Sequence, residues 1–213
     1  MKHTMLYMTL LAACATAACG KEEVKEPEKE LPMTSSEYIS FKVSATSPSE
    51  ETVITWEAVS DRIGVFVSDA GTGSALNDNA YYDAFTSTSS SRFFPLKDAD
   101  KLKWEEGKKY DVALYYPFSV KMKDATSIPV SVDEDQTVPI PLTSMQLKKE
   151  QLFVSSLKSV ERPDNGILEM SLSPVVSFVK INVSSNLPVA CKSIKITGEE
   201  GTALAFKHGK YDL

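Results

Sequence analysis

The chain has little of what most catalytic and metal sites are built from. Its 213 residues include three cysteines and two histidines. Cys14 and Cys19 stand near the start, so Cys191 is the one cysteine in the body, and an internal disulfide framework is excluded. His208 and Cys191 have no catalytic motif beside them, so we expect an exposed loop residue and an inert buried thiol.

Positive charge is also in short supply. Lysine and arginine number 23 against 29 acidic residues, for a formal net charge of −6. A nucleic-acid-binding face needs clustered lysine and arginine, so this class of partner is excluded. The acidic run at 133–135 and the pair Asp98 and Asp100 lack the spaced loop and glycine of a calcium site. We therefore expect no metal and no cofactor.

Long apolar runs and helical periodicity are missing as well. The apolar run at residues 5–18 is shorter than the roughly 20 residues that a membrane-spanning helix needs. A period of 3.6 supports no helix longer than about two turns, and residues 144–150 fit one helical turn. A hydrophobic content of 42% nevertheless provides for a core and excludes wholesale disorder.

Short strands dominate the pattern that is present. Alternating or continuous apolar runs of strand length, separated by polar turns, predict an all-β antiparallel β-sandwich. Prolines confine two of these runs, at 128–132 and 138–142, to sheet edges or crossing loops. The expected strands cover residues 38–45, 53–56, 63–67, 81–85, 110–116, 128–132, 138–142, 152–154, 168–172, 175–183 and 193–197.

The N-terminus has the pattern of a secretory signal: a basic start, an apolar middle and small residues. Leu11-Ala12-Ala13-Cys14 resembles a bacterial lipoprotein signal, in which the cysteine becomes acylated. Cys19 is followed by Gly20, Lys21, Glu22 and Glu23, which resembles the surface-export signal of Bacteroidales lipoproteins. We favour lipidation at Cys19, with Cys14 as the alternative. A plain signal peptide with incidental cysteines is the simpler hypothesis.

These features divide the chain into three parts. Residues 1–18 are the predicted lipoprotein signal peptide. Residues 19–37 are rich in Glu, Lys and Pro and cannot bury a core, so they form a flexible tether. Residues 38–213 form the predicted β-sandwich domain, and a second domain would start near 190–213.

The order of several motifs resembles the Bacteroidales fimbrillin family of type V pilus subunits and related surface lipoproteins. The resemblance rests on the order of these motifs behind a lipoprotein signal. The motifs are Thr55-Trp56, Asp61-Arg62-Ile63-Gly64-Val65-Phe66, Ala113-Leu114-Tyr115-Tyr116-Pro117-Phe118, Gln136, Leu152-Phe153-Val154, the strand pair at 172–183 and Ile194-Lys195-Ile196-Thr197-Gly198.

The resemblance implies a transthyretin-like N-terminal domain, with the second domain absent or truncated. It also implies that subunits polymerise by strand exchange, after a protease removes the first strand behind a basic residue. An unpaired strand edge is a template for another chain's strand. Here Lys42 is the only basic residue of the first strand, and the first arginine, Arg62, lies inside a core motif. These residues therefore do not decide whether a protease removes the first strand.

The function implied is that of a structural or accessory subunit of a pilus or adhesin, not of an enzyme. Its partners would be other pilus subunits or host and bacterial surface ligands. Its place would be the cell outer membrane, held there by lipid and exposed at the surface, or a fimbrium. The alternative is a monomeric surface lipoprotein that binds glycan or peptide through exposed Tyr81, Tyr82 or Trp104. For Tyr115-Tyr116 we favour core packing over a carbohydrate platform.

Overall fold

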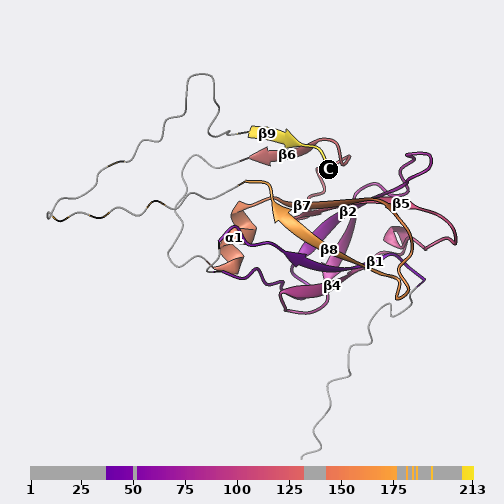
Figure 1. The fold of residues 1–213 in the computed structure, drawn as a ribbon, viewed down its shortest axis with the longest axis horizontal. Helices are drawn as coiled ribbons and strands as arrows, with labels where there is room; N and C mark the ends of the chain where they lie inside the picture. Colours follow the sequence, from indigo (N-terminus) through magenta and orange to yellow (C-terminus); the bar gives the residue numbers. More distant parts are fainter. Residues whose placement is uncertain are drawn as a thin grey trace, which may run out of the picture. The chain divides into compact units, whose positions relative to one another are not determined.

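The computed structural model describes residues 37–49, 52–131, 143–176, 181, 184, 186, 193 and 208–213 (Figure 1). Almost all of the regular structure is β-strand, joined by one α-helix and one short 3₁₀ helix. The elements are β1 (Ser40–Ala45), β2 (Arg62–Asp69), β3 (Ala80–Ala84), β4 (Ser90–Pro95), η1 (Asp98–Asp100), β5 (Tyr110–Tyr116), β6 (Ile128–Ser131), α1 (Ser144–Glu150), β7 (Phe153–Val160), β8 (Ile167–Pro174) and β9 (His208–Tyr211).

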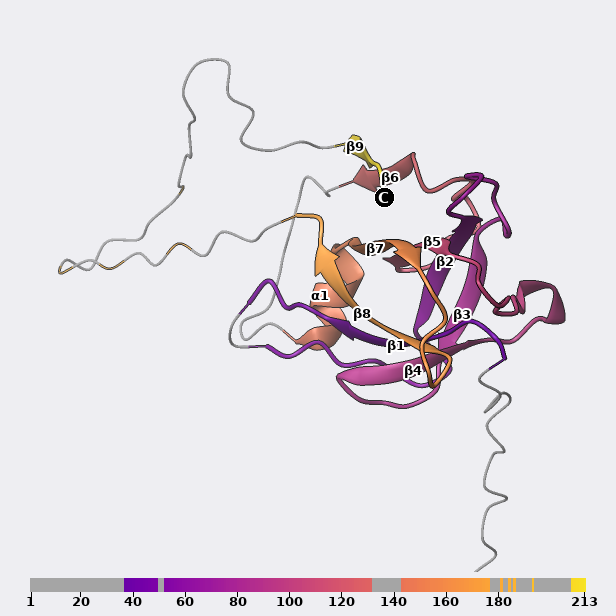
Figure 2. The same ribbon diagram turned by 45° about the vertical axis from the view of Figure 1, so that its right-hand side comes forward.

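Seven strands form one sheet that closes on itself in the order β1-β4-β3-β2-β5-β7-β8 (Figure 2). Every pairing in this barrel is antiparallel except that of β1 with β8, which is parallel. β6 and β9 make a separate two-stranded sheet. The all-β prediction is confirmed. The sheet closes as a barrel, and the sandwich with its transthyretin-like topology stays a prediction.

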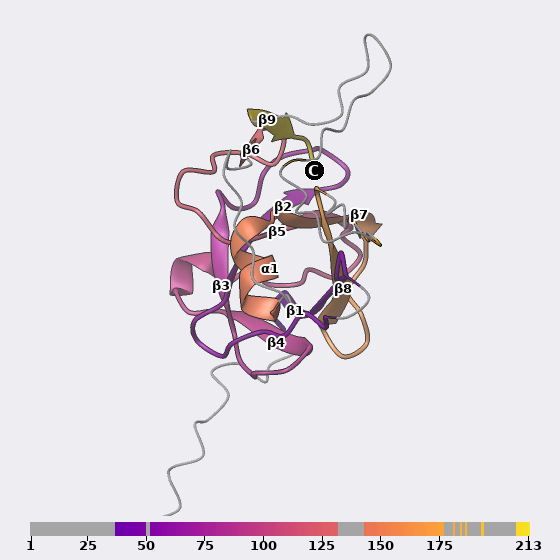
Figure 3. The same cartoon turned by 90° about the vertical axis from the view of Figure 1, so that its left-hand side faces the viewer.

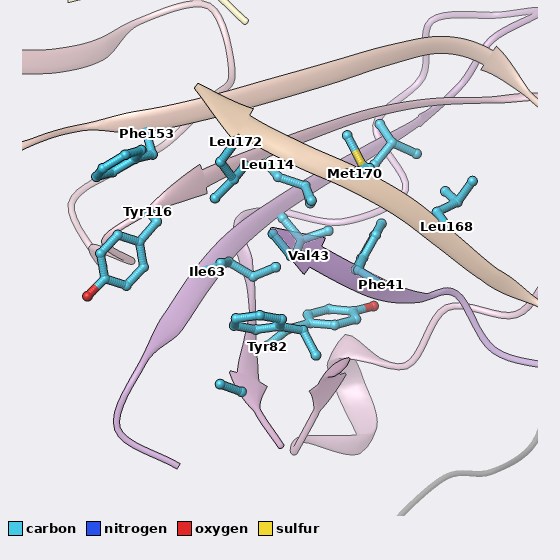
Figure 4. Close-up of a cluster of buried hydrophobic side chains, with 14 of the residues drawn as sticks. Phe41, Val43, Ile63, Tyr82, Leu114, Tyr116, Phe153, Leu168, Met170 and Leu172 are labelled. Atoms are coloured by element: carbon cyan, nitrogen blue, oxygen red, sulfur yellow. The ribbon is translucent and has the colours of Figure 1, made fainter. Parts of the chain in front are cut away.

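The barrel interior is filled by the apolar residues of each strand's inward face (Figure 4). On β8, Leu168, Met170 and Leu172 are buried and alternate with exposed Glu169 and Ser171, as their period of two predicts. Strands β1, β2, β3, β5 and β7 contribute to the same cluster, with Phe41, Val43, Ile63, Tyr82, Leu114, Tyr116 and Phe153.

Helix α1 lies across one end of the ring of strands, where Leu147 joins the core (Figure 3). Its start is fixed by a capping box, in which the Thr143 hydroxyl accepts from the Gln146 backbone N–H and the Gln146 side chain accepts from that of Thr143. Such a box satisfies backbone donors that the first turn leaves unpaired. The single helical turn expected at 144–150 is therefore present.

A second, smaller cluster lies on the outer face of β2, β5 and β7. Phe66, Ala113, Tyr115 and Val154 are buried there together with Ile128 of β6. Leu213 packs against this cluster, and its backbone N–H donates to the Ala125 carbonyl. The pairing of β6 with β9 thus ties the end of the described chain to the barrel.

Most of the expected strands are present, and one is not. Residues 53–56 form no strand: Trp56 turns into the core, and the Thr55 backbone N–H donates to the Ser144 hydroxyl of α1 at 2.8 Å. That prediction was wrong because Ile54 and Trp56 are buried by packing and not by strand pairing. The expected strand at 138–142 lies outside the described residues, as do all but three residues of 175–183, all but one of 193–197, and Gln136.

The predicted lipidation and export residues also lie outside the described part of the chain. This holds for Cys14, Cys19, Lys21, Glu22 and Glu23, and for Cys191 and the acidic run at 133–135. In the part that is described, the one α-helix is too short to cross a membrane.

Candidate assembly site

The first strand, β1, fills a slot between two strands that do not pair with each other. On one side it forms an antiparallel pair with β4, from Phe41 opposite Phe93 to Ser44 opposite Ser90. On the other side it runs parallel to β8, from Ser40 opposite Ile167 to Ala45 opposite Leu172. Removal of β1 would therefore expose two strand edges at once.

Side chains of β1, and of Ile39 immediately before it, anchor the strand in that slot. Ile39, Phe41 and Val43 are fully buried, and the Phe41 ring lies 5.3 Å from that of Tyr82. Full burial of such side chains stabilises the folded state by about 1.5–3 kcal/mol each. The slot is thus bounded by core residues and is filled by a strand with alternating large apolar residues.

Backbone bonds hold β1 at both of its ends. The Ile39 N–H donates to the Leu102 carbonyl and the Thr46 N–H to the Leu172 carbonyl, each at 2.8 Å. Between them, the Trp56 indole N–H donates to the Val43 carbonyl at 2.8 Å. Trp56 therefore holds β1 in place from the barrel core through this hydrogen bond, which is a structural role for the Thr55-Trp56 motif.

The basic residues relevant to cleavage are both engaged. Lys42 is exposed in the middle of β1 and forms an ion pair with Glu169 at 3.0 Å. Arg62 opens β2, donates to Asp83 at 2.9 Å and lies over the Tyr81 ring. Because both backbones belong to paired strands, local opening must precede any cut after either residue.

The Asp61 carboxylate is the centre of a buried polar cluster next to the slot. Its Oδ1 accepts from the Tyr116 hydroxyl at 2.7 Å, and its Oδ2 accepts from the Glu57 N–H at 2.7 Å and from the Lys148 ammonium of α1. Burial, and secondarily the bond to Asp61, raise the pKa of Tyr116 above its usual value. The Tyr116 hydroxyl therefore stays protonated and remains a donor to Asp61.

Sequence reasoning identified Asp61 and Tyr116 only as parts of two motifs and missed Lys148 entirely. The structure brings the two motifs together through one hydrogen bond, across 55 positions of sequence. No local signal could find Lys148, because its partner is 87 positions away.

A family model described as fimbrillin-like matches residues 45–213. The chain belongs to the fimbrillin-like family. The recognition made from the motif order is therefore confirmed. No curated protein matches the chain.

Solved structures with a likeness to this fimbrillin-like chain come from Bacteroides. A proposed cell adhesion protein of Bacteroides ovatus shares 15% identity with a TM-score of 0.44, over 65% of this chain and 51% of its own. A proposed cell adhesion protein of Bacteroides uniformis shares 19% identity with a TM-score of 0.40, over 64% of this chain and 46% of its own. A fimbrial protein of Bacteroides ovatus shares 17% with a TM-score of 0.35, over 65% and 28%. The chain thus matches about half of these proteins' length or less.

The aromatic residues proposed for ligand binding in the fimbrillin-like domain are mostly buried. Tyr82 is fully buried, with its hydroxyl near the Ile39 and Asp100 carbonyls, and Trp104 is 8% exposed. Their prediction as exposed residues was wrong because both rings complete the barrel core. Tyr115 and Tyr116 are buried too, which confirms packing over a platform.

Tyr81 alone keeps part of its ring at the surface. The ring packs against Phe118 at 5.3 Å between centroids, and it also contacts two cations. The Arg62 guanidinium lies 5.1 Å and the Lys97 ammonium 4.9 Å from its centroid. This arrangement can attract an anionic group to an aromatic surface.

Hollows in the described part of the domain include the following two. One, of about 480 Å³, has Trp104 in its wall and a rim of charged residues that includes Glu105, Glu106 and Lys108. The other, of about 350 Å³, lies beside Phe66 and Ala113 near Leu213. Across the described ranges, no group of histidine, cysteine, aspartate or glutamate side chains has the arrangement of a metal site.

Proposed function

We propose that this fimbrillin-like chain is a surface-anchored lipoprotein, a structural or accessory subunit of a pilus or adhesin that assembles through β-strands. The observation that carries the proposal is the β1 slot. The first strand of the described residues lies between β4 and β8, and it is joined to neither of them by a hairpin in that part of the chain. Family membership supports the assignment at the level of a pilus-type subunit.

The slot suits a strand supplied by another chain. Among the described elements β1 is followed along the chain by β2, which is not one of its two partners, so a foreign strand can occupy its place without altering the rest of the barrel. The foreign strand would reproduce the ladder bonds to β4 and β8 and insert its own apolar side chains where Phe41 and Val43 lie. The transthyretin-like sandwich and a second domain starting near 190–213 belong to the same proposal.

Strand exchange is tested with the full chain and a labelled peptide of residues 37–47. Under mild destabilisation the peptide is expected to bind and to compete with β1 for the slot, and a peptide carrying Phe41→Asp is expected to fail. Equal binding of both peptides would contradict strand-mediated assembly, because the slot selects large apolar side chains.

Anchoring is tested separately by feeding labelled fatty acid to cells that express the full chain. We expect label on the wild type and on Cys14→Ala but not on Cys19→Ala; loss with Cys14→Ala alone would move the site to Cys14. Residues Lys21, Glu22 and Glu23 are tested by surface protease accessibility after their joint replacement by alanine. Absence of the protein from sheared filament fractions and from every partner pull-down would count against a pilus subunit.

A second candidate function is binding of an anionic glycan or peptide by a monomeric surface lipoprotein. The supporting observation is the partly exposed Tyr81 ring beside Arg62 and Lys97. A glycan array with the wild type, Tyr81→Ala and the distant control Lys158→Ala tests it. We expect loss of binding with Tyr81→Ala only, and no bound glycan at all would end this alternative.

A further inference from the structure

The Lys148–Asp61 pair differs from the other ion pairs of the domain in where it lies. Both residues are almost fully enclosed, with 4% of Lys148 and 7% of Asp61 exposed. By contrast Lys103 and Glu37, which also contact each other closely, have side chains that are 56% and 52% exposed. Both pairs join a lysine ammonium to a carboxylate, and they differ in their exposure to water.

Aromatic rings and hydrogen bonds hold the buried pair in one arrangement. The Lys148 ammonium lies 5.8 Å from the Trp56 ring centroid, and Trp56 packs edge-on against Tyr116 at 5.3 Å. The Tyr116 hydroxyl binds Asp61 Oδ1, and the Glu57 N–H binds Oδ2. The amine nitrogen and the carboxyl group are therefore fixed next to each other in a mostly apolar space.

Burial makes the charged form of this pair costly. Two charges removed from water lose their hydration, and their mutual attraction often does not make up the loss. Transfer of one proton from the ammonium to the carboxylate removes both charges, and burial lowers the cost of that transfer compared with water. The neutral amine so formed is a nucleophile, and its hydrogen-bond partner Oδ2 belongs to the carboxyl group that it would attack.

We propose that Lys148 and Asp61 form an intramolecular amide bond. The Lys148 nitrogen attacks Asp61 Cγ, and the charge that develops on Oδ1 is stabilised by the Tyr116 hydroxyl. The C–N bond forms while the bond from Cγ to Oδ2 breaks. Oδ2 leaves as water with two of the three former ammonium protons, and the third stays as the amide N–H. No oxidant, reductant or co-reactant is needed.

Such a bond would staple two distant parts of the domain. It would join the turn before β2 to helix α1, across 87 positions of sequence. The body of the chain contains only Cys191, so a disulfide cannot provide an internal cross-link. The inference does not depend on the proposed pilus function, and either can fail without the other.

The bond is tested by tryptic peptide mapping of the full-length wild-type protein under denaturing conditions. An amide at Lys148 blocks cleavage after that residue, so residues 43–62 and 124–149 should be recovered as one linked species. Its mass should fall short of the sum of the two peptides by one water molecule. Recovery of free 43–62 and 124–148 with no linked species overturns the proposal.

Two comparisons sharpen this test. In Lys148→Arg, which keeps the positive charge but cannot form the amide, peptide 43–62 is expected to appear free. Within the wild-type digest, Lys103 serves as an internal control, because its water-exposed pair with Glu37 should leave cleavage after Lys103 complete. Should Lys148→Arg fail to fold, the wild-type digest alone still decides. A linked species that persists in Lys148→Arg would also overturn the assignment to Lys148.

Discussion

The ring of Tyr115 occupies the space directly over Gly64. The two residues are paired in register on β5 and β2, and a Cβ added to Gly64 would lie 2.6 Å from the Tyr115 hydroxyl oxygen and closer still to the ring. The ring is fully buried, and its hydroxyl donates to the Asn79 side chain at 2.7 Å. Glycine is thus required in the Ile63-Gly64-Val65 motif by a neighbouring strand.

Gly64→Ala is therefore expected to lower the free energy of unfolding by about 1–3 kcal/mol, since an overpacked site must displace its neighbours. Gly71→Ala is the matched control: an added Cβ there meets only an Asp69 oxygen, at 3.3 Å, and the change should stay within about 0.5 kcal/mol. Urea unfolding of the two variants measures both. Equal losses of stability in the two variants would show that the Tyr115 ring can move aside at little cost.

Val59 should be a site where glycine stabilises. This β-branched residue is 54% exposed and has a φ of 69°, in the left-handed region that costs an L-residue about 1–2 kcal/mol. Val59→Gly removes that strain and adds some unfolded-state entropy, so a net gain of about 0.5–1 kcal/mol is expected in thermal or urea unfolding. Ser60→Gly, at a position without positive φ, should instead lower stability slightly.

The two faces of β1 should respond very differently to truncation. Phe41→Ala empties a fully buried site and should cost about 3–5 kcal/mol. Lys42→Ala removes an exposed ion pair with Glu169 and should cost at most about 1 kcal/mol. Urea midpoints measure the contrast. A large effect of Lys42→Ala would mean that the exposed ion pair with Glu169, and not the buried side chains, holds the strand.

Alkaline pH should weaken the domain through its buried tyrosines. Burial, and then the charge of Asp100, raise the pKa of Tyr82 above its usual value of 10.0. Above pH 10 the unfolded phenol ionises while the folded one keeps its proton, so the stabilising contribution is complete below pH 10 and falls as the pH rises. The slope per group is about 1.4 kcal/mol per pH unit.

Tyr82→Phe should remove this part of the pH dependence. Between pH 9 and 11.5, the free energy of unfolding of Tyr82→Phe should fall less steeply than that of the wild type. Identical slopes would show that Tyr82 ionises alike in the folded and unfolded states. The comparison uses denaturant unfolding at fixed salt, so that screening of surface charges is constant.

Periodicity was enough to find most of the barrel strands, and on β8 it also gave the buried face, but it did not do so for every strand. Residues 110–116 and 168–172 show clear apolar runs, and both are strands. At Tyr81-Tyr82, two adjacent aromatic residues give no alternation, so nothing local tells which one points inward. Trp104 lies in a loop, and its indole N–H donates to the Gly166 carbonyl 62 positions away, which no local pattern can indicate.

The candidate site was predictable only in its separate pieces. Family resemblance pointed to the motifs at Asp61 and Tyr116 and to exchange of the first strand. The resemblance did not predict the parallel pairing of β1 with β8, because this pairing joins residues more than 120 positions apart in the sequence. The capping box of α1 was a signal within reach, since Thr143 precedes Gln146 by three positions.

The parallel seam between β1 and β8 has a mechanical consequence. A pull on the chain ahead of Glu37 is directed along β1, while its ladder bonds to β4 and β8 run across that axis. The load is then shared by all of these bonds at once, in shear, and they do not open one by one as in a hairpin pulled from its free end. Under a pull applied ahead of Glu37, the domain would therefore resist extraction of β1 far better than the short length of this strand suggests.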